Sequence, residues 1–269
     1  MLGKLLKHEF MATGRFMWVI YAAMVALSVG ANFSLRYLER GTNQILEALT
    51  VLVTVIWALS LVIGMVATIV LMVRQFQKNL LTDEGYLMFT LPGTVHHLVL
   101  SKIIVAAVWF MASIAVIILC CVIAVFESSF LRGITEFFRA VADAMTVKFA
   151  INGTAVIIEL LVLLFLGCAS ACLQFYSAIS IGYGFNNHKA LWSVVFYFIQ
   201  STVLQVLGII LMVMFANSEI MVSSNVVVRM TEMQAWHLGM LIFCGLELIL
   251  CAVFYIITVL NLQKRLNLA

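Results

Sequence analysis

Six long apolar stretches dominate this sequence and restrict what the chain can fold into. Each runs for 18 residues or more, which is long enough for a helix to cross the hydrocarbon core of a bilayer. Because unpaired backbone groups are not tolerated in lipid, continuous helices are the expected form. The stretches are Phe16–Ser34, Ala48–Val73, Ile103–Phe126, Thr154–Ile181, Ala190–Ala216 and Leu238–Leu260. The sequence therefore predicts an all-α, polytopic membrane protein with six transmembrane helices in a single transmembrane domain over residues 1–269.

Composition narrows the classes of function. Of the 269 residues, 65% are hydrophobic and 10% are charged, against about 45–50% and about 25% in globular proteins. After six spans of roughly 20 residues each, the remainder consists of short loops and ends. These pieces are too small for a nucleotide-hydrolysing domain. We therefore expect neither a self-powered pump, nor a secreted protein, nor a protein that binds nucleic acid.

The even number of spans places both ends of the chain on one side of the membrane. With the ends inside, nine Lys and Arg residues lie on the cytoplasmic side and six lie on the outer side. This bias has the direction of the positive-inside rule. We therefore expect cytoplasmic N- and C-termini.

Two segments outside the spans have the pattern of amphipathic helices. In residues 127–150, large apolar side chains recur on one helix face, which predicts an extracytoplasmic segment that lies on the outer leaflet or caps the bundle. In residues 1–15, apolar side chains recur at helical spacing opposite basic ones, as in a helix that lies in the headgroup layer. A basic flank that only sets topology is the alternative for residues 1–15. The apolar residues of this N-terminal interfacial helix are Leu2, Leu5, Leu6 and Phe10.

Signatures of catalysis and of metal binding are missing from the sequence. It contains no H-E-x-x-H zinc motif, no G-x-S-x-G elbow and no G-x-x-x-x-G-K-[ST] phosphate loop. The adjacent His96 and His97 would point roughly 100° apart on a helix and cannot jointly hold a metal. Cys168 and Cys172 share one helix face, but no histidine lies near them in the sequence, so we interpret the cysteines as packing residues. We therefore expect no enzymatic activity, no metal and no cofactor on this chain.

Two acidic residues fall within the apolar stretches. Glu159 lies near the predicted outer end of the fourth stretch, whereas Glu247 lies near the middle of the sixth. An ionised carboxylate at that depth costs roughly 2.5 kcal/mol or more, so Glu247 is expected to face the bundle interior, a cavity or a partner. If Glu247 carries protons, the chain would be a proton-coupled transporter. Alternatively, Glu247 is a structural group bonded to Gln200, Thr202 or Gln205 of another span.

The longest predicted cytoplasmic loop, residues 74–101, is unusually apolar. Asp83 and Glu84 lead into a run of large side chains that must end as a helix by Leu91, because the residue before Pro92 is pushed out of helical geometry. A short aromatic and aliphatic element of this kind suits a groove on another protein. Packing back onto the membrane surface is the alternative.

This loop also carries a resemblance to a known family. The run Glu84–Pro92, with Ser101 and Lys102 opening the third stretch, resembles the first cytoplasmic loop of bacterial type-2 exporter permeases of the ATP-binding cassette superfamily. The opening Leu5–Phe10 run is similar to the start of such permeases, as are the six spans with cytoplasmic ends. The arrangement of spans is similar over the whole chain, whereas the sequence motifs are similar only over short runs.

The resemblance implies a permease subunit, located in a bacterial cytoplasmic membrane, that pairs with a second permease chain, identical or homologous. Two ATP-binding cassette ATPase subunits would bind ATP and Mg beneath the pair, and residues 1–15 would be a connecting helix. Family members often have re-entrant outer helices before the sixth span, but the polar segment Asn217–His237 argues against a deep pair here. The loop would dock on the ATPase through Asp83, Glu84, Gly85, Tyr86, Leu87, Phe89, Leu91 and Pro92.

The expected cargo follows from composition. Apolar spans with few buried charges favour an amphipathic or hydrophobic substrate, such as a drug, an antimicrobial peptide or a lipid. A membrane sensor or immunity module that binds a ligand without transporting it is a further alternative.

Overall fold

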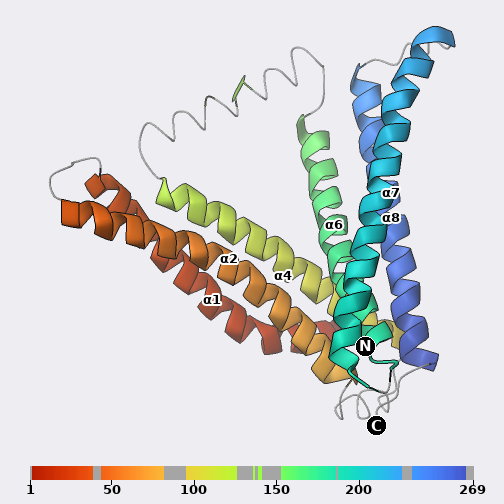
Figure 1. Cartoon of the computed structure of the whole chain (residues 1–269), viewed down its shortest axis with the longest axis horizontal. Coiled ribbons are helices and arrows are strands. Elements are labelled where there is room, and N and C mark those ends of the chain that lie inside the picture. The colour runs from red at the N-terminus through yellow and green to blue at the C-terminus, as the bar shows by residue number, and fades with distance from the viewer. Residues whose placement is uncertain are drawn as a thin grey trace. The chain divides into compact units, whose positions relative to one another are not determined.

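The computed structural model of the chain describes residues 2–38, 44–81, 95–125, 136, 139–140, 153–185, 187–225 and 232–264. This described part forms six long α-helices (Figure 1). They are α1 (Leu2–Leu38), α2 (Gln44–Leu81), α4 (Val95–Ala124), α6 (Gly153–Gly182), α7 (Lys189–Asn225) and α8 (Glu232–Lys264). Each contains a segment that is long and apolar enough to cross a membrane. The prediction of an all-α protein with six helices of membrane-spanning length and apolarity is therefore confirmed for the described residues, whereas the cytoplasmic location of both termini stays a prediction.

The helices extend beyond the apolar stretches that predicted them. The 37 residues of α1 rise about 55 Å, whereas the hydrocarbon core of a bilayer is about 30 Å thick. The extra turns come from polar residues that favour helix but do not add to an apolar count. In α2, for example, the turns after Val73 contain Gln75 and Lys78 and continue to Leu81.

The N-terminal segment is helical from Leu2 onward, as residues 1–15 predicted. It forms the first turns of α1 and is continuous with the first span. Leu5, Leu6 and Phe10 are half-buried, and the side chain of Leu2 is not described. An orientation of these turns in the membrane plane stays a prediction.

Two other predicted segments lie outside the described residues. Of residues 127–150, only three are described, and the loop residues 82–94 are not. The loop of residues 82–94 includes every residue expected to dock on an ATPase, namely Asp83, Glu84, Gly85, Tyr86, Leu87, Phe89, Leu91 and Pro92. The polar segment Asn217–His237, by contrast, is largely described: α7 continues as a helix to Asn225, and α8 begins at Glu232.

The chain divides into two compact units. Unit 1 comprises Met1–Phe76 and His97–Lys148, and unit 2 comprises Gln77–His96 and Phe149–Ala269. Unit 1 thus contains α1 with most of α2 and α4, and unit 2 contains α6, α7 and α8 together with the end of α2 and the start of α4.

Polar contacts show how the helices of unit 1 run. Along α1 and α4 the paired residues advance together, from Tyr21 with Ser113 to Asn32 with Ala124, so these two helices are parallel. Between α1 and α2 the order is reversed: Ser28 contacts Trp57, while a residue near the start of α1 contacts the end of α2. The alternating directions are those expected for three successive membrane spans.

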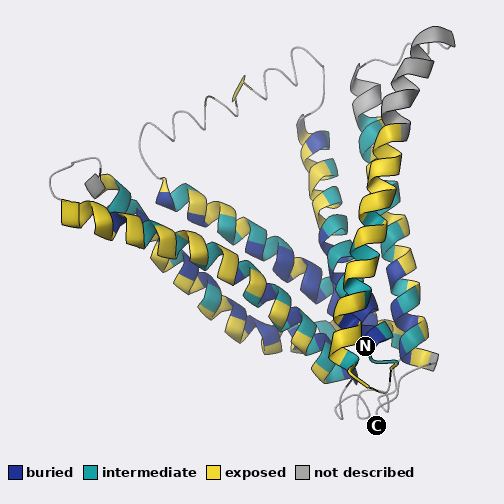
Figure 2. Cartoon of the chain, viewed as in Figure 1, coloured by how far each residue is buried: buried dark blue, intermediate teal, exposed yellow. Residues whose placement is uncertain are grey.

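In unit 2, α6 packs against both α7 and α8. The rings of Phe175 and Tyr197 stack with centroids 4.6 Å apart, which joins α6 to α7. At the end of α6, a Cβ on Gly182 would lie 2.5 Å from the backbone nitrogen of Ser193, so glycine permits this close approach. Much of α7 is exposed (Figure 2), and none of the most apolar 18-residue window of its span is buried.

Candidate functional site

Two buried charges meet in unit 1. Glu9 of α1 and Lys102 of α4 form an ion pair, and only 8% and 4% of their surfaces are exposed. Nε2 of Gln75, from α2, donates a hydrogen bond to the other carboxylate oxygen of Glu9. One carboxylate therefore joins three helices. We refer to Glu9, Gln75 and Lys102 as the charged cluster.

Burial makes the charged cluster energetically sensitive. Removing two ions from water is costly, and the attraction between them offsets that cost only when the geometry is good and the remaining lone pairs are satisfied. Here Lys102 neutralises Glu9, and the Gln75 amide satisfies the second oxygen. Loss of either charge would remove the buried counter-charge of the other.

The charged cluster lies next to the predicted docking loop in the sequence. Gln75 is within two helical turns of Leu81, where α2 ends, and Lys102 is within two turns of Val95, where α4 begins. These are the two helix ends that flank residues 82–94. The cluster thus ties α1 to both helices that enter this loop.

A second set of hydrogen bonds continues from the charged cluster along α1 and α4. Thr13 donates from Oγ1 to the carbonyl oxygen of Glu9 over 2.8 Å. The same hydroxyl accepts a 2.8 Å hydrogen bond from Nε1 of Trp109. A Cβ on Gly14 would lie 3.7 Å from the Trp109 ring, and the centroids of the Trp109 and Phe10 rings are 6.1 Å apart. The indole is therefore held by both a hydrogen bond and close packing against α1.

One helical level further along, three hydroxyl groups meet. The Tyr21 hydroxyl lies 2.8 Å from Oγ of Ser113, and that oxygen lies 3.0 Å from Oγ1 of Thr68. Tyr21 also donates to the carbonyl oxygen of Trp109 over 3.1 Å. These side chains come from α1, α4 and α2, and all are buried.

Together these contacts fix the axial register of the three helices. A slip of one residue moves a side chain 1.5 Å along the helix and turns it by 100°. Such a slip would separate the charged pair and the hydroxyl groups at the same time, leaving polar atoms unpaired in an apolar interior. The interior of unit 1 is therefore specified by polar contacts as well as by apolar packing.

Unit 2 contains the two acidic residues that the sequence singled out. Nδ1 of His237 lies 2.5 Å from Oε1 of Glu159, so the starts of α6 and α8 are joined. Within the described part of the chain, Oε2 of Glu159 and Oε2 of Glu247 are buried atoms without a hydrogen-bond partner. Among the described residues, each of these two carboxylates therefore has one oxygen that accepts no hydrogen bond.

The partners suggested for Glu247 make other hydrogen bonds. The side-chain oxygen of Gln200 accepts from Ser177 over 3.0 Å, and Thr202 donates to the carbonyl oxygen of Phe198 over 2.9 Å. Both the functional and the structural role of Glu247 stay predictions.

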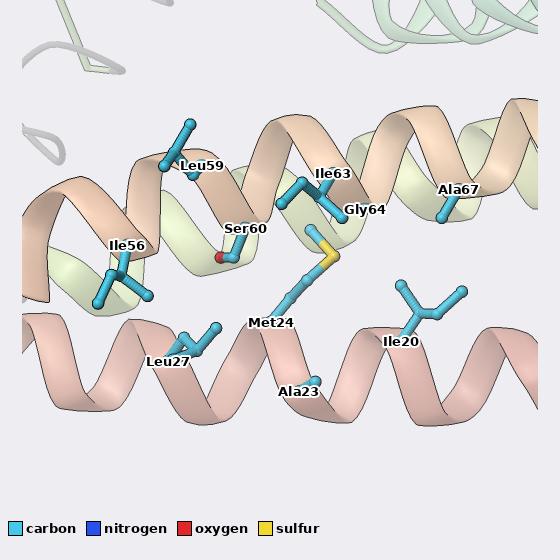
Figure 3. Close-up of a pocket in the computed structure, with 10 residues that line it drawn as sticks. All are labelled: Ile20, Ala23, Met24, Leu27, Ile56, Leu59, Ser60, Ile63, Gly64 and Ala67. Atoms are coloured by element: carbon cyan, nitrogen blue, oxygen red, sulfur yellow. The ribbon is translucent and has the colours of Figure 1, made fainter.

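An apolar groove lies between α1 and α2. Its volume is about 420 Å³. Met24 points across it toward Gly64, as Figure 3 shows. Ser60 is its one hydroxyl residue, and this hydroxyl donates to the carbonyl oxygen of Trp57 over 2.7 Å. The lining residues are Ile20, Ala23, Met24, Leu27, Ile56, Leu59, Ser60, Ile63, Gly64 and Ala67.

Sequence reasoning missed the charged cluster, although one signal for it was present. Glu9 follows Leu5 by four residues and Leu6 by three, so it lies on the apolar stripe of the N-terminal helix. An acid on an apolar stripe predicts a buried partner. Which basic residue would supply that partner depends on the packing of α4, and the local pattern does not contain this information.

The described residues contain no group of three His, Cys, Asp or Glu side chains placed to hold a metal ion. The six cysteines are free thiols, and Cys168 and Cys172 are buried. Comparisons with protein-family models, with curated proteins and with solved structures find no match to this chain.

Proposed function

We propose that this chain is the permease subunit of an ATP-binding cassette exporter in a bacterial cytoplasmic membrane. It forms the translocation pathway with a second permease chain, and a separate ATPase docks on its loop of residues 82–94. The six membrane-compatible helices support the layout, and the resemblance of Glu84–Pro92 supports the docking role.

One observation carries this proposal. The two described runs that show the resemblance, Leu5–Phe10 and Ser101–Lys102, are far apart in the sequence but are joined by the buried pair of Glu9 and Lys102. A permease driven by an external motor needs a firm connection between its docking loop and its spans. The charged cluster supplies such a connection in unit 1.

The cluster also suggests how movement would pass to the spans. Closure of the ATPase around nucleotide would displace the docking loop and, with it, the adjoining ends of α2 and α4. Because Glu9 holds Gln75 and Lys102 together, α1 would move with both ends as one body. The coupling would be mechanical and would need no chemistry on this chain.

The cargo would be amphipathic or hydrophobic. A groove of about 420 Å³ in unit 1, lined by apolar side chains, has the chemistry to hold an alkyl chain or an apolar side chain. A sugar or an ion would leave polar groups unpaired there.

The docking role is tested by co-purification of the full chain with an ATP-binding cassette ATPase from its native membranes. The double substitution Tyr86→Asp and Leu87→Asp is expected to abolish the complex, because it places charge in the apolar docking face. Thr94→Asp, in the same loop but outside Asp83–Pro92, is the matched control and should retain the complex. Unchanged membrane insertion and size-exclusion elution of both variants show that the chain is intact. A complex that survives the double substitution would refute the docking role.

A second candidate function is proton-coupled transport through Glu247. The observation that favours it is the buried Oε2 of Glu247, which has no hydrogen-bond partner in the described residues. Proton flux would then depend on this carboxylate. Transport that keeps its pH response after Glu247→Gln would exclude the second candidate.

A further inference from the structure

The starts of α6 and α8 are joined by two titratable side chains. Nδ1 of His237 lies 2.5 Å from Oε1 of Glu159, and only 26% and 28% of the two side chains are exposed. Both residues lie within two turns of the start of their helix. Both helices belong to unit 2 and pack against each other. The contact therefore holds two helix ends together within one unit.

This contact requires a proton between its two atoms. Without one, a lone pair on Nδ1 would face a lone pair on the carboxylate oxygen at 2.5 Å. When His237 has taken up a proton, both ring nitrogens are donors and the contact is an ion pair. Charge-assisted hydrogen bonds of this kind are about twice as strong as neutral ones. The strength of the contact therefore depends on how many protons the pair holds.

The surroundings of the pair favour the state with one bound proton. Among the described residues, Oε2 of Glu159 accepts no hydrogen bond although it is buried, so the partner of this carboxylate there is His237. A charge in apolar surroundings is costly without a counter-charge. With one bound proton the pair is neutral overall, whereas loss of that proton leaves a net negative charge between the helices. Loss of the proton thus removes the ion pair and adds a desolvation cost.

Other titratable groups lie further along the packed helices. Glu247 is about 15 Å along α8 from His237, and Lys189 lies at the start of α7, which packs beside the end of α6 rather than its start. The remaining titratable side chains described on these three helices are cysteines and tyrosines, which are uncharged near neutral pH. The nearest of them along each helix are Cys168 of α6, Tyr197 of α7 and Cys244 of α8.

We propose that Glu159 and His237 form a proton-binding site that controls the packing of α6 on α8. With the proton bound, the ion pair holds the two helix starts together; without it, the helix starts separate. Imidazole is the side chain whose charge ordinarily changes between about pH 5 and 8. Because the charge of an imidazole is lost as the pH rises, the contact is closed at the acidic end of this range and open at the basic end.

This inference goes beyond the proposed function and does not depend on it. The site needs neither an ATPase nor a cargo, and it does not involve Glu247, on which the second candidate function depends. The predicted topology, with both chain ends in the cytoplasm, places the starts of α6 and α8 on the outer side of the membrane. The packing of these helices would then respond to the pH outside the cell.

Amide hydrogen exchange of the full chain in vesicles, at pH 6 and at pH 8, tests the site. After correction for intrinsic exchange rates, the protection of residues 157–162 and 237–242 should fall about 3- to 10-fold from pH 6 to pH 8. In His237→Gln, which keeps a hydrogen-bond donor but takes up no proton, protection should be equal at both pH values. His97→Gln, at an exposed position of α4, is the matched control and should behave like the native chain. Equal pH responses of the native chain and His237→Gln would overturn the proposal.

A second measurement shows whether the two residues act as one site. In detergent, the unfolding constant of the native chain should rise about 3- to 10-fold relative to that of His237→Gln between pH 6 and pH 8. Glu159→Gln and the double variant should lose the same pH-dependent part, because either substitution removes the ion pair. Glu247→Gln, which changes another acid of unit 2, should keep it. A native pH response in Glu159→Gln, or additive losses in the double variant, would contradict a shared proton site.

Discussion

The two units of this protein hold their helices together in different ways. In unit 1, buried polar side chains join α1, α2 and α4 at several levels, from Glu9 with Lys102 to Tyr21 with Ser113. In unit 2, the polar contacts among the described residues are fewer, and they include Ser177 with Gln200 and His237 with Glu159. Stacked rings and a glycine contact also join α7 to α6, and the apolar window of the α7 span has no buried residue. Buried polar contacts therefore fix how the helices of unit 1 pack, whereas within unit 2 most of the apolar surface of α7 is not covered.

This difference fits a division of labour between the two units. A unit tied by a buried ion pair resists internal sliding, so it is suited to transmitting a displacement. A unit with an exposed apolar helix, such as α7 in unit 2, is suited to contacting another membrane helix. Substitutions confined to one unit at a time separate the two roles. The expected loss of unfolding free energy decreases from the charged cluster to Glu247.

Breaking the charged cluster should have the largest effect. Glu9→Leu removes the carboxylate that forms the ion pair with the buried Lys102, and the unfolding free energy in detergent should fall by about 3–5 kcal/mol. Adding Lys102→Met should recover much of the loss, because the buried charge that has lost its Glu9 partner is then removed as well. Lys4→Leu, at an exposed position of the same helix, is the control and should change little. Additive losses in the double variant would show that the two charges are not coupled.

The glycine contact of unit 2 should come next. Gly182→Ala forces a Cβ to within 2.7 Å of Ser193 Cα, a backbone atom that cannot move aside cheaply. We expect a loss of about 1–3 kcal/mol in thermal or denaturant unfolding. Gly167→Ala, on the same helix with no atom within 4 Å of its Cβ, should be neutral or stabilising. Equal effects at both positions would disprove the close approach of α6 and α7.

Removing one hydroxyl from unit 1 should have a smaller effect. Tyr21→Phe deletes the hydrogen bonds to Ser113 and to the carbonyl oxygen of Trp109, and it should lower the unfolding free energy by about 0.5–1.5 kcal/mol. Tyr197→Phe keeps the ring that stacks on Phe175 and serves as the control in unit 2. A larger loss of unfolding free energy for Tyr197→Phe than for Tyr21→Phe would contradict the conclusion that polar contacts contribute more to unit 1 than to unit 2.

The smallest effect is expected at Glu247. Glu247→Gln removes a carboxylate whose Oε2 has no hydrogen-bond partner in the described residues, so stability should change by no more than about 0.5 kcal/mol. ATP-dependent transport in vesicles should also persist, since the proposed motor is external. Loss of transport with normal folding would favour the proton-coupled candidate instead.

The sequence predicted the helices well because apolar length is a local property. All six stretches lie within described helices over most of their length, and the main errors are at the ends, as where the first span continues back to Leu2. The pairing of Glu9 with Lys102 was not predictable, because it depends on which faces of α1 and α4 meet. His237 was placed in a polar outer segment, so its contact with Glu159 was also missed. Tertiary packing decides both contacts.

The central claim is that this chain serves an external ATPase, and isolation of the native complex tests it most directly. The full chain would be purified from its own membranes in mild detergent, and its partners would be identified and assayed for ATP hydrolysis. We predict a stoichiometric subunit that hydrolyses ATP and that is lost in the Tyr86→Asp, Leu87→Asp variant but kept in Thr94→Asp. The account would be contradicted if the chain purified without any nucleotide-hydrolysing partner. It would also be contradicted if the partner still co-purified with the Tyr86→Asp, Leu87→Asp variant.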